Sequence, residues 1–161
     1  MIKNFFRTIA AALSFSVLAG AEAQLVADSD LPIDITGDTA EFQDNLATWT
    51  GNVRVVQGEG ILTTKRLEAV LLDDGGFETI TAIGDVRYSN GKEALTGGRA
   101  VFNDQARTIT MTEDVIVTQG KQVLSAGKVT YWVDTGKVLF TPEAGKRIRG
   151  LFFTQSDDEQ T

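Results

Sequence analysis

The stretch TGNVRVVQG occupies residues 50–58, and a close variant of it returns twice further along the chain. The second copy begins at Gly84 (GDVRYSNG) and the third at Glu113 (EDVIVTQG), so the valines of the three copies are 33 and 29 residues apart. In each copy apolar and polar residues alternate and a glycine follows. Because alternate residues of a strand face opposite sides, each copy is typical of a half-buried β-strand that ends in a tight turn.

A second unit follows each copy at the same spacing. It occupies residues 62–67 (LTTKRL), 95–100 (LTGGRA) and 124–129 (LSAGKV), and an earlier partial copy of the first motif covers residues 35–42. Turn-forming pairs rich in Gly, Asn and Asp separate the units. A repeat this short cannot bury its own apolar face, so the copies must stack into one continuous core. The pattern predicts an all-β protein of short antiparallel strands.

The second unit contains a geometric clue. Its first and last apolar residues, such as Leu62 and Leu67, are five positions apart, which on a straight strand places them on opposite faces. If both face inward, the chain must bend between them, and the small residues at 97–98 and 126–127 suit such a corner. We therefore expect two facing sheets joined along bent strands, a groove-like sandwich or roll. A short turn of helix is expected only at residues 39–43.

Composition narrows the classes of function. The chain has 161 residues, a formal net charge of −7, and neither His nor Cys. The usual zinc ligands, the Ser-His-Asp and Cys-His catalytic sets and a disulfide framework are therefore excluded. An acidic chain is also a poor partner for nucleic acid, which is bound through clustered Lys and Arg. We predict no catalytic residue, no metal site and no cofactor.

The first residues have the layout of a secretory signal peptide. Lys3 and Arg7 precede ten uncharged residues at 9–18, and an Ala-Glu-Ala sequence ends at Ala23. We predict a signal peptide at residues 1–23, a single β domain at 24–153 and a disordered acidic tail at 154–161. The apolar run is short for a membrane span, although an uncleaved anchor is the alternative. We place the exported protein in a bacterial periplasm, where, without any Cys, its core and backbone ladder alone must hold it together.

The inward face of the predicted strands is apolar. Such a face could close into an ordinary sandwich core, or it could line a trough that binds a long apolar molecule, and composition does not decide between the two. The candidates for the lining of a groove are Ile33, Ile35, Trp49, Val53, Val55, Leu62, Val86, Tyr88, Leu95, Phe102, Met111, Val115, Val117, Leu124 and Tyr131.

The chain resembles a known family over nearly all of residues 31–153. The motif at 50–58, its return at 115–120, and shorter matches at 32–38, 129–134 and 145–148 resemble the periplasmic LptA (OstA-like) proteins of lipopolysaccharide transport. The repeated TGNV-x-V-x-QG string is fairly specific to that family. The match departs at Glu113, where glycine is usual, and this leaves the bend of that strand open.

The resemblance implies a fold and a role. Family members form an open V-shaped β-jellyroll of two antiparallel sheets with an apolar groove, and they are not enzymes. They join head to tail, and join related domains of an inner-membrane anchor (LptC-like) and an outer-membrane translocon (LptD-like), so that lipopolysaccharide slides along the groove. The residues expected at partner-binding sheet edges are Pro32, Ile33, Ile35, Val138, Phe140, Ile148 and Phe152.

Two other classes of function remain as alternatives. A periplasmic glycan hydrolase would need paired carboxylates, for which Glu41 and Glu68 are candidates, although nothing in the sequence spaces them for this reaction. A structural repeat protein would polymerise through its sheet edges without binding lipid.

Overall fold

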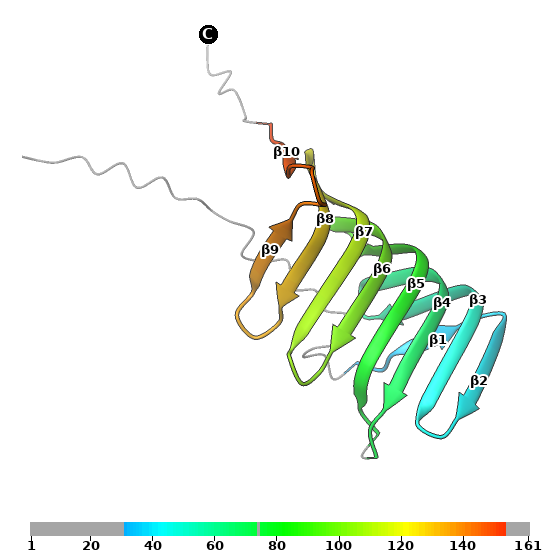
Figure 1. The fold of residues 1–161 in the computed structure, drawn as a ribbon. Coiled ribbons are helices and arrows are strands. Elements are labelled where there is room, and N and C mark those ends of the chain that lie inside the picture. The colour runs from blue at the N-terminus through cyan, green and yellow to red at the C-terminus, as the bar shows by residue number, and fades with distance from the viewer. Residues whose placement is uncertain (1–30, 74, 154–161) are drawn as a thin grey trace, which may run out of the picture.

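The computed structural model describes residues 31–73 and 75–153, and all regular secondary structure there is β. The predicted signal peptide and acidic tail lie outside these residues. Six long strands form a meander with two short strands at each end (Figure 1). The strands are β1 (Asp34–Thr36), β2 (Thr39–Gln43), β3 (Leu46–Gln57), β4 (Gly60–Leu71), β5 (Phe77–Ser89), β6 (Glu93–Asn103), β7 (Thr108–Gln119), β8 (Gln122–Trp132), β9 (Lys137–Thr141) and β10 (Arg149–Leu151).

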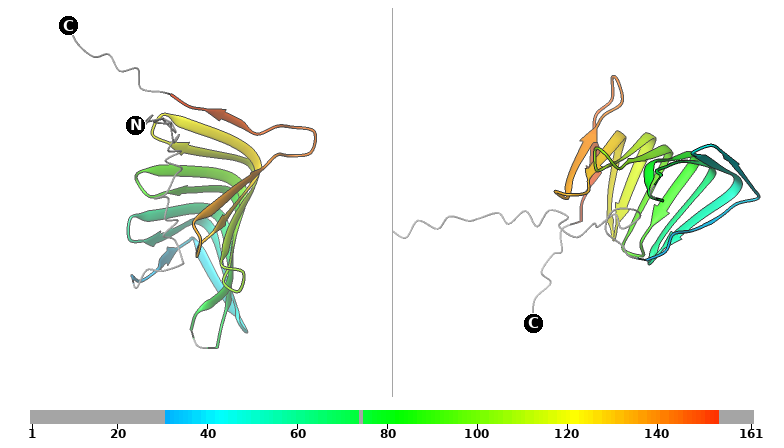
Figure 2. Two further views of the ribbon diagram at one scale, coloured as in Figure 1. Left: turned by 90° about the vertical axis from the view of Figure 1, so that its left-hand side faces the viewer. Right: turned by 90° about the horizontal axis from the view of Figure 1, so that it is seen from below.

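All ten strands belong to one antiparallel sheet that is folded along a line across its middle. β1 and β2 both pair with β3, and β9 and β10 both pair with β8, so each end of the sheet has two edge strands. The long strands bend sharply, and their halves diverge from the bend as a V (Figure 2, left). The predicted all-β, V-shaped roll is confirmed, and its two sheets are the two halves of this continuous sheet.

We call these halves the first wall and the second wall. The first wall contains β1, β10 and residues 53–57, 60–64, 86–89, 93–97, 115–119 and 122–126 of the long strands. The second wall contains β2, β9 and the other halves of the same strands. We call the line where the walls meet the crease.

The crease is built by the repeated sequence motif. Pairing between neighbouring strands shifts register there, and the extra residues lie on β3, β5 and β7. Each of these three strands has one pair of consecutive residues at the shift, namely 51–52, 84–85 and 113–114. All six residues have positive φ angles between 47° and 83°. Gly, Asn and Asp tolerate this left-handed conformation best, so the motif is the sequence signature of a bulge.

The predicted corner in the second unit is confirmed in position, although the extra residues are in the first unit. The small residues of β6 and β8 lie opposite the bulges. In β4 the buried Thr64 hydroxyl lies 2.9 Å from the carbonyl oxygen of Ile83 and 3.0 Å from that of Gly84. This side chain satisfies backbone oxygens that the register shift removes from the regular ladder.

The expected turn of helix at residues 39–43 is wrong, because this segment is strand β2. It pairs with β3 in register from Thr39 opposite Thr50 to Gln43 opposite Leu46. The break between β1 and β2 lies against the crease, where the Asp38 backbone N–H donates to the Gly51 carbonyl at 2.8 Å and Asn52 Nδ2 donates to Asp38 Oδ2 at 2.9 Å. The ladder with β3 therefore outweighs local helical preference.

Glu113 adopts the bulge conformation although it is not glycine, with φ of 70°. The residue across the ladder, Gly98, makes room for the Glu113 side chain. At Gly98 of β6 a methyl group would come within 2.7 Å of Glu113 Cβ, so only glycine leaves room for the Glu113 side chain. At the previous crease position the arrangement is reversed, because the Lys65 side chain covers Gly84, where a Cβ would lie 3.3 Å from Lys65 Cβ. Both of these contacts thus combine one large side chain with one glycine.

This reciprocity predicts a double-mutant cycle. Glu113→Gly should stabilise the fold by about 1 kcal/mol, because glycine adopts the left-handed conformation without strain. Gly98→Ala should destabilise it by about 2 kcal/mol through overpacking against Glu113. Combined with Glu113→Gly, the Gly98→Ala change should lose most of its cost. Urea unfolding of the four proteins measures the coupling, and strictly additive free energies would contradict the packing described.

Candidate ligand-binding groove

The two walls enclose an open groove of about 390 Å³. Directly paired residues share a face of the sheet, so the register arranges its lining in rows. One row runs along the first wall through Ile35, Val55, Leu62, Tyr88, Leu95 and Val117. Another runs along the second wall through Ile80, Phe102, Ile109, Tyr131 and Val138. The open groove argues against a fully closed sandwich core.

Most of the predicted groove residues are brought together here. Leu62 and Leu67, five positions apart, both line the cavity, as the corner requires. Ten members of the predicted lining contact the groove, and they are Ile33, Ile35, Val55, Leu62, Tyr88, Leu95, Phe102, Met111, Val117 and Tyr131.

Five predicted lining residues lie elsewhere. Val53, Val86 and Val115 are at most 1% exposed and form the core of the crease, where the walls touch each other. Trp49 and Leu124 are partly buried and pack against that core without lining the groove. Val53, Val86 and Val115 hold the walls together, whereas Trp49 pairs with Leu67 and Leu124 pairs with Val117. The assignment of these five residues as groove lining stays a prediction.

Several lining residues are not marked by the sequence pattern. Ile80, Ala82 and Ile109 line the second wall in strand halves that the repeated motifs do not cover, and Ala100, at the end of a second unit, lines it as well. Their signal is cross-strand pairing with predicted members, since Ile80 and Ile109 both pair with Phe102. Val138 and Phe140 of β9, expected at a partner edge, also line the groove. Glu93 was missed as well.

At the free end of the first wall, Glu93 lines the groove beside Gln119. Glu93 begins β6 and pairs with Gln119 at the end of β7, and the Gln119 Nε2 donates to Glu93 Oε1 at 3.0 Å. The Glu93 backbone N–H donates to Asn90 Oδ1 at 2.9 Å, which fixes the preceding turn. Glu93 is only 7% exposed, and burial raises the pKa of its carboxyl.

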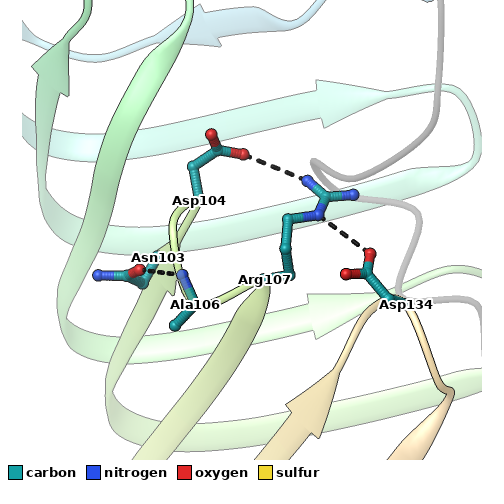
Figure 3. Close-up of polar contacts among 5 residues, drawn as sticks. All are labelled: Asn103, Asp104, Ala106, Arg107 and Asp134. Carbon is teal, nitrogen blue, oxygen red and sulfur yellow. Dashed lines mark hydrogen bonds and ion pairs between the residues drawn. The ribbon is translucent and has the colours of Figure 1, made fainter.

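The free end of the second wall is held by charge (Figure 3). Arg107, in the turn between β6 and β7, donates from Nη1 to Asp104 Oδ1 at 3.2 Å and from Nε to Asp134 Oδ1 at 3.1 Å. Asp134 belongs to the next hairpin turn, and the Val133 backbone N–H donates to the Arg107 carbonyl at 2.9 Å. Asp134 and Asp104 raise the pKa of Arg107. These contacts tie two neighbouring turns into one rim.

The predicted partner edges coincide with the ends of the sheet. Ile35 is in β1, and Val138 and Phe140 are in β9; both are terminal strands. Pro32, Ile33, Ile148 and Phe152 flank β1 and β10 outside regular strand. Three consecutive apolar residues at the end of the described chain, Leu151, Phe152 and Phe153, are each at least 50% exposed.

The alternative carboxylate pair lies outside the groove. Glu41 and Glu68 both pair with Thr48, one from each side of β3, and neither lines the cavity. Glu68 Oε1 accepts a hydrogen bond from Arg66 Nε at 2.8 Å. Within residues 31–73 and 75–153 no group of three or more acidic side chains is arranged to hold a metal ion.

In the part of the chain that the structure describes, no helix is long and apolar enough to cross a membrane. The fold and groove define a class of open β-roll with an apolar trough. A family model described as "LptA/(LptD N-terminal domain) LPS transport protein" matches residues 34–137, and the chain belongs to this family.

Individual relatives agree with this assignment. The LPS-assembly proteins LptD of Pectobacterium atrosepticum and of Yersinia pestis are 35% and 36% identical over 82 and 81 residues, which is 47% of this chain. The matched segment spans 10% of the length of each of these curated relatives. The crystal structure of LptH, the LptA homologous periplasmic component from Pseudomonas aeruginosa, is similar in fold, with a TM-score of 0.64 and 21% identity. This match covers 77% of this chain and 96% of that one.

The buried carboxyl predicts a pH-dependent stability difference. Folding raises the Glu93 pKa, so the stabilisation of its neutral form is complete below the unfolded pKa of about 4.3 and is lost as pH rises through the folded pKa. Glu93→Gln should therefore gain stability relative to the wild type between pH 4 and pH 7. Thermal unfolding at both pH values measures this, with Glu59→Gln at an exposed hairpin position as control. A stability difference between Glu93→Gln and the wild type that is the same at both pH values would contradict this prediction.

Proposed function

We propose that this protein binds lipopolysaccharide and shields its acyl chains in the groove between the walls during transport across the periplasm. The observation that carries the proposal is the continuous apolar lining, which rows of paired residues extend from β1 to β9. The family description supports the substrate class. The reading as a structural repeat protein without a ligand leaves this open, apolar groove unexplained.

The energy of transfer fits such a role. Each methylene removed from water gains about 0.8 kcal/mol, so a chain of about twelve methylenes gains roughly 10 kcal/mol. A mainly apolar lining provides this gain along the groove and makes few directional contacts that must be broken when the chain advances. We propose binding and transfer as the function, with no chemical step.

We further propose that the sheet edges join copies head to tail and join related domains of an inner-membrane anchor and an outer-membrane translocon. In the described residues β1 pairs only with β3, and β10 only with β8, so each has a free strand edge. A free edge can add a strand from another chain. Residues 1–23 are proposed to direct export to the periplasm, and an N-terminal mass measurement of the exported form tests cleavage after Ala23.

Photo-crosslinking from neighbouring residues of β7 tests the groove. Ile109 lines the cavity, whereas Thr110 faces the opposite side of the same wall. A photoreactive residue at Ile109 should give a lipopolysaccharide adduct in cells, and one at Thr110 should give at least tenfold less. Equal labelling, or labelling at Thr110 alone, would contradict acyl-chain binding in the groove.

Crosslinking from the two ends of the sheet tests assembly. Photoreactive residues at Ile33 and at Phe152 should trap products between chains, because both positions flank terminal strands. The mid-sheet position Thr110 is the matched control and should trap none. A protein that stays monomeric at high concentration and gives no such products would contradict joining through the edges.

A further inference from the structure

Glu93 is out of place in an apolar groove. Apart from Gln119, with which it pairs, its neighbours on the same face of the first wall are hydrocarbon or aromatic: Leu95 lies two residues along β6, and Tyr88 and Val117 pair with Leu95. A carboxyl that is 7% exposed in such surroundings costs free energy unless its oxygens accept hydrogen bonds. Packing alone therefore does not explain a carboxyl at this position.

The carboxyl is only half satisfied by the protein. Gln119 donates to Oε1, and among the described residues no hydrogen bond or ion pair reaches Oε2. Glu93 is among the residues that line the groove, so a molecule in the groove can contact this side chain. Gln119 orients the carboxyl from one side and leaves the other oxygen for a ligand.

We propose that Glu93 binds a hydroxyl group on an acyl chain and so selects hydroxylated chains, an inference that rests on the proposed acyl-chain groove. The ligand must carry a donor into a region lined by hydrocarbon. A hydroxyl meets this condition at a lower desolvation cost than an ammonium group. Glu93 is thus a specificity residue, and Gln119 is its positioning residue.

The place of Glu93 in the wall also fixes where the hydroxyl lies. Glu93 is the first residue of β6, at the free end of the first wall, whereas the crease residues Val86 and Val115 lie at the bottom of the V. An acyl chain that enters tail first places its head-group end at this rim. The selected hydroxyl is therefore within a few carbons of the head group.

Neutral esters that differ by one hydroxyl test the proposal. Methyl 3-hydroxytetradecanoate and methyl tetradecanoate have the same chain and no charge to repel a carboxylate, and displacement of a fluorescent fatty-acid probe gives their relative affinities. The wild type should bind the hydroxylated ester about tenfold more tightly. Glu93→Leu should reduce the ratio to about one, and Glu93→Gln, which keeps an acceptor oxygen, should retain a ratio of about three.

Two further measurements separate the possible failures. Leu95→Ala, on the same face of β6, should weaken both esters equally and leave their ratio unchanged, and circular dichroism checks that each variant folds. Equal binding of both esters by the wild type would overturn the selection by Glu93 while leaving the groove intact. Binding of neither ester would overturn the proposed function itself. Glu93→Leu could fail to fold. In that case the inference is still contradicted when the wild type shows no preference between the esters and the affinity ratio of Glu93→Gln is the same.

Discussion

The structure depends on pairs of residues in the left-handed backbone conformation, which lie at the crease on every second long strand. Each pair adds a residue to β3, β5 or β7 and turns the sheet through the crease. Without these bulges the same apolar rows would lie on one open sheet face, exposed to water along its whole length. With them, both walls direct their apolar rows into a shared groove, and the short strands at each end divide at the same line. The groove is therefore a consequence of local backbone conformation repeated in register.

The repeated motif made the fold predictable because it contains both the strand and its bend. Alternation correctly placed Val55, Tyr88 and Val117 inward. It also placed Val53, Val86 and Val115 inward, which is correct for the face, but these residues form the contact between the walls. Periodicity reports which face a side chain occupies, whereas its distance from the crease decides whether it meets a neighbour or a ligand. That distance depends on the pairing register of neighbouring strands, which a single sequence indicates only indirectly.

The missed residues have the same physical origin. Ile80 and Ile109 precede the bulge in strand halves that vary from copy to copy, so no repeat marked them, and pairing with Phe102 places them. Glu93 follows a turn and is charged, so in the sequence it resembles an ordinary exposed residue. Only the pairing of the strands shows that it faces the groove beside Gln119. Glu113 is the converse case, because its departure from glycine is explained by Gly98 across the ladder.

The central claim is that acyl chains occupy the space between the walls. Nuclear Overhauser effects between the acyl methylenes of bound lipopolysaccharide and labelled methyl groups of the protein test it most directly. We expect contacts to Ile80 and Ile109, which line the groove, and none to Ile116, which is 44% exposed on the outer face. Contacts confined to Ile116 and other outer-face methyl groups would contradict it.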